Sequence, residues 1–141
     1  MKKSEIAKEK FQCYNCCQSV LISFSEELGL PEGAALKLSS GFGGGMSLGE
    51  TCGAVTGAYM VLGLKNTPSL TIQETKTKIK TMVKEFNCKF IEKHGSLTCK
   101  ELIGFNLSDP EEAEKASIEK VFDTICPHLV SSSVEILDTE F

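Results

Sequence analysis

Residues 41–58 read GFGGGMSLGETCGAVTGA, and they carry the most information about how the chain folds. Five glycines lie between Ser39 and Gly49. They exclude an ordinary helix interior, because each glycine costs a helix about 1 kcal/mol relative to alanine. We therefore expect a loop with unusual backbone angles or a close approach of two backbones. Gly53 and Gly57 follow at a four-residue spacing, which predicts a helix over about 52–62 that a neighbouring backbone can approach closely. We expect this helix to be the central one.

The remaining sequence reads as helices separated by glycine, proline and serine. Apolar residues recur at three- and four-residue steps, and no segment alternates with the two-residue period of a strand. Gly29 and Pro31 are typical of a helix end and of the first position of the next helix. We expect helices over about 4–28, 31–38, 52–62 and 71–94, a short helix opened by Thr98, and a helix from Asp109 to about Leu129 that Pro127 closes.

The helical pattern predicts the fold class and the buried face of two of the helices. The fold class is all-α: a compact single domain over residues 1–141, with about five to six helices and a glycine-rich loop before the central one. The tail from Ser131 is expected to form a last turn or a mobile end. The predicted inner residues are Ile72, Ile79, Met82, Val83, Phe86 and Phe90 in one helix, and Ile118, Val121, Phe122, Ile125 and Leu129 in the other.

Composition excludes several classes of function. The chain has 141 residues and a formal net charge of −4, with both signs interleaved. It therefore has no basic patch of the kind that binds nucleic acid. It has no apolar run of about 20 residues that would insert in a membrane. The first residues lack the apolar segment of a secretory signal, so we expect a cytoplasmic protein.

The seven cysteines are the unusual feature of the composition. An odd number without an export signal does not suggest a disulfide scaffold, because the cytosol keeps thiols reduced. Buried cysteine also packs as a small hydrophobic residue, and this explanation suits some of the seven. It is a poor explanation for all of them, so we expect some thiols to carry the chemistry.

Cys52 is predicted at a helix start, where a thiolate is favoured. If Thr51 is the N-cap, Cys52 is the first helical residue, and free N–H groups and the helix dipole lower its pKa. An alternative capping box from Ser47 to Glu50 would place Cys52 one turn inside the helix. Cys99 repeats the arrangement after Thr98, in a second capping-box pattern with Glu101.

The pair Cys13 and Cys16 has Cys-x-x-Cys spacing. A thioredoxin-type motif follows a strand, whereas this pair lies in a helical pattern. The pair could chelate a metal, but zinc sites usually add a second close pair. The scattered cysteines still allow a cluster assembled from distant helices. His94 and His128 match no haem-attachment motif and are expected to be surface or capping residues.

Five segments of the chain resemble the C_GCAxxG_C_C family of small redox-active proteins. They are Asn15-Cys16-Cys17-Gln18-Ser19-Val20-Leu21, Gly41-Phe42-Gly43-Gly44-Gly45-Met46, Cys52-Gly53-Ala54-Val55-Thr56-Gly57-Ala58 with Val61-Leu62-Gly63-Leu64, Cys99-Lys100-Glu101-Leu102, and Cys126-Pro127.

The resemblance implies that the working cysteines are Cys16, Cys52, Cys99 and Cys126. They would serve as catalytic thiols in dithiol–disulfide or electron-transfer chemistry, or as ligands of an iron–sulfur cluster or a divalent metal. It leaves Cys13, Cys17 and Cys88 as packing or accessory thiols. A redox protein is the expected partner, and the small-residue helix would suit a homodimer. A glycine loop can also cradle a phosphate, although no known phosphate motif matches. The candidate cofactor-binding glycines are Gly43, Gly44, Gly45 and Gly53.

Overall fold

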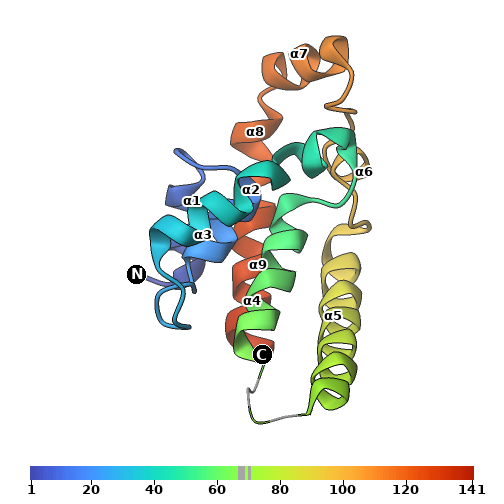
Figure 1. Ribbon diagram of the computed structural model, residues 1–141. Coiled ribbons are helices and arrows are strands. Elements are labelled where there is room, and N and C mark those ends of the chain that lie inside the picture. Colours follow the sequence, from blue (N-terminus) through green and yellow to red (C-terminus); the bar gives the residue numbers. More distant parts are fainter. Residues whose placement is uncertain (67–68, 70) are drawn as a thin grey trace.

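The computed structural model describes residues 1–66, 69 and 71–141, and these residues are mostly helical (Figure 1). Their only regular pairing of extended backbone is a single antiparallel β-bridge between Thr51 and Thr98. The all-α prediction is confirmed, with more helical segments than the five to six expected. The α-helices are α1 (Lys3–Lys10), α2 (Cys16–Ile22), α3 (Glu32–Ser39), α4 (Gly53–Lys65), α5 (Ile72–His94), α6 (Cys99–Ile103), α7 (Pro110–Ile118), α8 (Val121–Thr124) and α9 (Cys126–Glu140).

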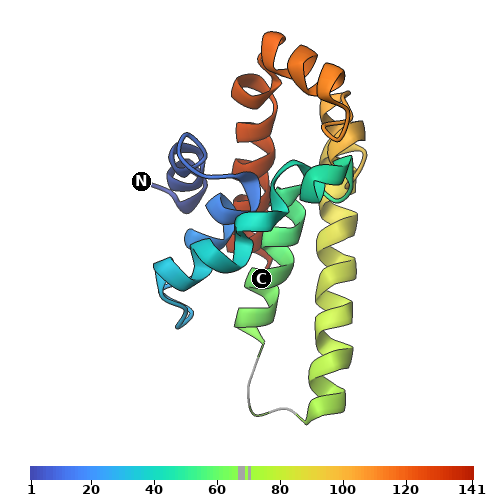
Figure 2. The same ribbon diagram turned by 45° about the horizontal axis from the view of Figure 1, so that its top comes forward.

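Two parallel helices, α4 and α9, form the centre of the molecule (Figure 1). Helix α2 packs on α4, and α1 packs on α9. The long helix α5 runs antiparallel to α4 on the opposite side, while α7 and α8 stand beyond the start of α9 (Figures 1 and 2). No helix in the described part of the chain is both long and apolar enough to cross a membrane.

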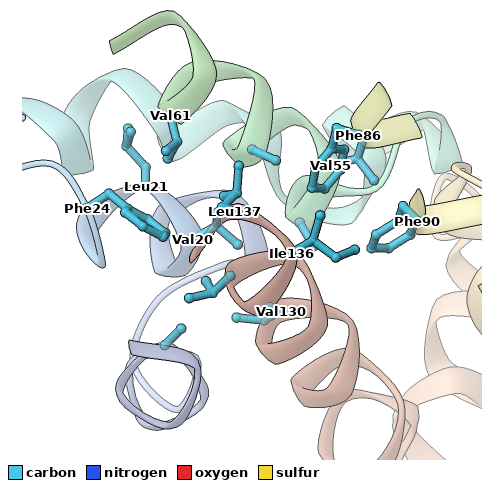
Figure 3. Close-up of a cluster of buried hydrophobic side chains, with 14 of the residues drawn as sticks. Val20, Leu21, Phe24, Val55, Val61, Phe86, Phe90, Val130, Ile136 and Leu137 are labelled. Carbon is cyan, nitrogen blue, oxygen red and sulfur yellow. The ribbon is translucent and has the colours of Figure 1, made fainter. Parts of the chain in front are cut away.

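The hydrophobic core lies where α2, α4, α5 and α9 meet (Figure 3). Eight of the thirteen residues of α4 are buried, which confirms that it is the central helix. Phe86 and Phe90 of α5 stack with ring centroids 5.8 Å apart. The buried side chains include Val20, Leu21, Phe24, Val55, Val61, Phe86, Phe90, Val130, Ile136 and Leu137.

The predicted helix over 4–28 is wrong, because the chain breaks before Asn15. The Asn15 side chain accepts a hydrogen bond from the Gln18 N–H at 2.8 Å, and the Gln18 side chain accepts one from the Asn15 N–H at 3.0 Å. This reciprocal capping box begins a new helix at Cys16. The apolar spacing hid this local signal, and Cys13 lies in the exposed turn between α1 and α2.

The predicted end of the chain is also wrong. Pro127 does not close a helix; it lies in the first turn of α9, where a missing N–H costs nothing. The helix that begins at Pro110 instead ends at Ile118, and Lys120 turns the chain with a φ of 59°. Ile118 is consequently 70% exposed. The tail from Ser131 is the body of a buried helix and not a mobile end.

Helix α5 follows its sequence signals closely. Thr71 and Glu74 form the predicted capping box, and Gly95 ends the helix with a φ of 85°. Phe86 and Phe90 are buried as expected. Ile72 was expected inside, but it is 79% exposed at the free end of the helix.

The glycine-rich segment is more ordered than the loop we expected. It forms a 3₁₀ turn over Ser40–Phe42 and a π-type turn over Gly45–Gly49. Four consecutive residues, Gly44 to Ser47, have φ values of 59–63°. This run includes Met46 and Ser47, whose side chains make the left-handed conformation costly. The unusual backbone angles that the glycines predicted are therefore present.

Candidate functional site

Four cysteines from four helix starts line one pocket of about 810 Å³. Cys16, Cys99 and Cys126 are the first residues of α2, α6 and α9, and Cys52 is the N-cap of α4. A helix start presents free N–H groups that can stabilise negative charge, and the four thiols differ in how far they benefit from them. Only Cys16 is half-buried at the residue level, whereas the other three residues are buried.

The β-bridge between Thr51 and Thr98 positions two of these thiols. The Cys52 N–H donates to the Leu97 carbonyl at 2.8 Å, and the Cys99 N–H donates to the Glu50 carbonyl at 2.6 Å. These bonds join the residues that precede α4 to those that precede α6. The starts of the two helices, and their cysteines, are therefore held together by backbone contacts.

Two glycines allow the cysteines to approach. A Cβ atom on Gly53 would lie 2.9 Å from the Cβ of Cys16, and one on Gly45 would lie 2.9 Å from the Cβ of Cys99. Real Cβ atoms essentially never approach so closely, so a side chain at Gly53 would displace Cys16 or the backbone of Cys17. A side chain at Gly45 would also meet the Glu50 backbone, at 2.5 and 2.7 Å. Gly44 and Gly45 line the pocket with Gly53, while Gly43 packs against Asn15.

Asn15 fixes the position of Cys16. Besides capping α2, its side-chain Nδ2 donates to the Ser40 carbonyl at 3.1 Å. This contact ties the start of α2 to the turn that precedes the glycine segment. Asn15 also lines the pocket itself.

The pKa values of Cys16 and Cys52 are displaced in opposite directions. Hydrogen bonds to the sulfurs of Cys126 and Cys52, followed by burial, raise the pKa of the Cys16 thiol well above its ordinary value. The hydrogen bond from Cys16 lowers the pKa of Cys52, against burial, and the N–H groups of Ala54 and Val55 lower it further. Cys52 is therefore the favoured thiolate, and Cys16 holds its proton.

Cys99 differs from Cys52 although both lie at helix starts. Burial, and then the charges of Cys52 and Cys126, raise the pKa of Cys99 to about 12. Helix α6 is only five residues long, so its dipole is small. The prediction that both Cys52 and Cys99 are low-pKa thiols is wrong for Cys99.

The pocket walls are mainly apolar, and charged side chains lie at its rim. Glu5, Glu9 and Asp123 contribute carboxylates, and Lys8 contributes an ammonium group. Glu5, Lys8 and Glu9 belong to α1, and Asp123 belongs to α8. Both helices pack against α9. The apolar and aromatic lining comprises Phe11, Tyr14, Ile103, Leu107, Phe122 and Leu129.

The other three cysteines lie outside this pocket lining. Cys13 and Cys88 are exposed, and Cys17 is buried in the core beside Met60, with 3.9 Å between the two sulfurs. Burial raises the pKa of Cys17 to about 11. The His94 side chain is hydrogen-bonded within the protein: its Nε2 lies 2.8 Å from the Ser132 hydroxyl and links α5 to α9.

The prediction of a metal site finds no support in the described part of the chain. Among residues 1–66, 69 and 71–141, no three Cys, His, Asp or Glu side chains are placed to hold one. A structural zinc or iron–sulfur site needs its thiolates gathered around one centre.

Sequence reasoning placed Cys52 one position too far into its helix. Thr51 does not cap α4; Cys52 is itself the N-cap, with φ −55° and ψ 138°. Neither does Thr98 accept a capping hydrogen bond, since its hydroxyl donates to Glu101 Oε1 at 2.9 Å. The helix starts at Cys16 and Cys126 were missed. The Asn15–Gln18 pair and Pro127 were the signals that could have revealed them.

Comparison with protein families gives one match, to a family described as "Putative redox-active protein (C_GCAxxG_C_C)", over residues 14–140. The match spans the four helix starts that carry the pocket cysteines. No curated protein and no solved structure matches the chain.

Proposed function

The chain belongs to the C_GCAxxG_C_C family, and on this premise we propose that it is a thiol redox protein in which Cys52 and Cys16 cycle between a dithiol and a disulfide. The observation that carries the proposal is the shared pocket: Cys16 and Cys52 both line it, and Gly53 lets the start of α4 lie against the Cβ of Cys16. The pKa of Cys16 is raised, first by Cys126 and then by Cys52, and Cys16 in turn lowers the pKa of Cys52. A dithiol redox centre needs one accessible thiolate and one protonated resolving thiol within reach. Cys52, reached through the pocket that it lines, is the favoured thiolate, and Cys16 in the same pocket keeps its proton.

The exchange proceeds in two displacement steps. The Cys52 thiolate attacks one sulfur of a substrate disulfide, a mixed disulfide forms, and the first substrate thiolate leaves. Cys16 then gives its proton to that departing thiolate, and its sulfur attacks the sulfur of Cys52. The Cys16–Cys52 disulfide forms, and the second substrate thiolate leaves and takes a proton from water. Two electrons have passed from the protein sulfurs to the substrate sulfurs.

Cys126 and Cys99 have supporting roles in this proposal. Cys126 is the largest cause of the raised pKa of Cys16, so it helps to keep Cys16 protonated. Cys99 keeps its proton at neutral pH because its pKa is raised. Neither is proposed as the attacking group. A reductant of the thiol class must restore the dithiol after each turnover, and a redox protein partner, a homodimer and a cytoplasmic location remain predictions.

Alkylation kinetics test the assignment of the thiolate. Reduced protein is treated with iodoacetamide across a pH series, and modified cysteines are identified by peptide mass spectrometry. We expect Cys52 to react with a midpoint below that of Cys13 and Cys88, which are exposed controls. Cys16→Ala is expected to raise the Cys52 midpoint because it removes the side-chain donor, which a serine hydroxyl would replace. Equal midpoints for Cys52 and Cys88 would contradict the assignment.

Disulfide mapping tests the pairing. Protein oxidised with diamide is digested without reduction, and we expect a Cys16–Cys52 cross-linked peptide. The same procedure on Cys13→Ser should give the same peptide. A Cys99–Cys126 peptide as the sole product would contradict the pairing. Anaerobic purification with metal analysis covers the competing function: stoichiometric iron and visible absorption would favour a cluster protein.

A further inference from the structure

We propose that the thiol pocket binds a small organic disulfide whose body is apolar or aromatic and uncharged or cationic, rather than a disulfide in a protein. This inference rests on the thiol redox function proposed above and names the substrate class of the same site. It is carried by the pocket's size, its lining and its rim.

The size and lining of the pocket match a small molecule. Its volume of about 810 Å³ falls in the range of about 300–1,000 Å³ that is usual for small-molecule sites. Phe11, Tyr14 and Phe122 provide aromatic surface beside the cysteines. Aromatic side chains favour planar apolar ligands through stacking as well as through buried area.

The burial of the thiols disfavours a protein substrate. Cys52 is 3% exposed and Cys126 is 5% exposed. A partner loop reaching Cys52 would have to bring its backbone N–H and C=O groups between apolar walls. Each such group left without a partner costs about 1–3 kcal/mol. A small disulfide reaches the same sulfur without this cost.

The rim selects ligand charge. Three carboxylates, from Glu5, Glu9 and Asp123, stand against the single ammonium of Lys8. An anionic ligand entering the pocket meets net repulsion, which is stronger beside apolar walls than in bulk water. A neutral or cationic ligand meets none.

Two aromatic disulfides of similar size test the inference: dithiodipyridine, which is uncharged near neutral pH, and dithiobis(nitrobenzoate), which carries two carboxylates. Rates of thiol release by the reduced protein are divided by the rates for free dithiothreitol with the same probe. We expect this corrected rate to favour dithiodipyridine by about tenfold. Glu9→Lys with Asp123→Lys should raise the corrected rate for the anionic probe several-fold. Asp138→Lys, at the far end of α9, is the control.

Two phenylalanines test whether the aromatic lining of the pocket contributes to binding the disulfide. Phe122 and Phe105 both pack on a second, smaller cluster of buried residues, and of the two only Phe122 lines the pocket. The cluster comprises Cys99, Ile103, Ala116, Val121 and Cys126. Phe122→Ala should lower kcat/KM for dithiodipyridine by about tenfold, whereas Phe105→Ala should leave it close to that of the unmodified protein. Equal effects of the two changes would overturn the inference, as would reduction of insulin disulfides as fast as dithiodipyridine.

Diamide separates this inference from the function on which it rests. A Cys16–Cys52 disulfide that forms with diamide, together with no effect of Phe122→Ala or of the rim changes, would overturn the substrate class alone. Failure of that disulfide to form with diamide would overturn the redox function and the substrate class together.

Discussion

Thr51 and Thr98 form an antiparallel β-bridge although 46 residues separate them in the chain, and the two flanking backbone bonds hold α4 and α6 start to start. The two helix starts are thus joined through backbone hydrogen bonds, which fix the positions of Cys52 and Cys99 relative to each other.

The first prediction concerns the amide protons of Cys52 and Cys99. Residues at a helix start usually exchange quickly, because their N–H groups have no partner in the helix. Here both N–H groups are bonded to carbonyls of the other segment, so we expect slow exchange. Hydrogen exchange followed by NMR checks this, with the Lys100 amide in the first turn of α6 as the fast reference. Exchange of Cys52 and Cys99 at the Lys100 rate would contradict the bridge.

The second prediction compares two glycines of α4. Gly53→Ala should lower the free energy of unfolding by about 1–3 kcal/mol, because its methyl group meets Cys16 and the backbone of Cys17. Gly63→Ala should raise it by about 0.5–1 kcal/mol, because nothing lies within 4 Å and alanine favours the helix. Urea unfolding of both variants provides the measurement. The same sign for both changes would show that the site is not closely packed.

The third prediction concerns the left-handed turn. Ser47 is exposed with a φ of 59°, so Ser47→Gly should stabilise the protein by about 0.5–1 kcal/mol. Ser47→Ala keeps the strain and should give no such gain. Thermal or urea unfolding distinguishes the two variants.

The fourth prediction concerns Asn15. Asn15→Ala removes the cap of α2 and should cost about 1 kcal/mol. It should also raise the iodoacetamide midpoint of Cys52, because Cys16 would lose its fixed position. Asn15→Asp keeps a capping oxygen and should retain most of the stability. A loss of stability with an unchanged Cys52 midpoint would show that Asn15 does not position Cys16.

The fifth prediction concerns alkaline pH. Burial raises the pKa of Cys17 to about 11, from an ordinary value of 9.0, so the folded chain keeps a proton there that the unfolded chain releases. Stability is therefore fully present below about pH 9 and falls as pH rises toward 11. Urea unfolding at a series of pH values under reducing conditions should show this decline. Cys17→Ala should reduce the slope of the free energy of unfolding against pH by the equivalent of one bound proton. An unchanged slope would contradict the burial of the Cys17 thiol as the cause.

Local signals in the sequence predicted what local physics controls. The capping pair Thr71 and Glu74 and the terminating Gly95 gave the bounds of α5 almost to the residue. The apolar spacing over 4–28 misled, because it does not reveal the break before the Asn15 cap, and α1 buries only Ala7. The prediction that Pro127 ends a helix fails because proline suits the first turn of a helix equally well.

The candidate site depended on long-range packing and could be predicted only in part. The four pocket cysteines came from the resemblance to a family, because nothing local distinguishes Cys126 from Cys88. The opposite pKa shifts of Cys16 and Cys52 depend on which thiol touches which. No spacing in the sequence contains that information.

The four helix starts at the pocket have a consequence for synthesis of the chain. Translation releases Cys16 and Cys52 well before Cys126, and Cys126 begins α9, which forms half of the central helix pair. A ribosome-bound chain therefore exposes unpaired thiols, without their final neighbours, until the last helix has emerged. The protein is at its most vulnerable to mispaired disulfides during its own synthesis, and oxidative stress at that stage should lower the yield of native protein more than stress applied after folding.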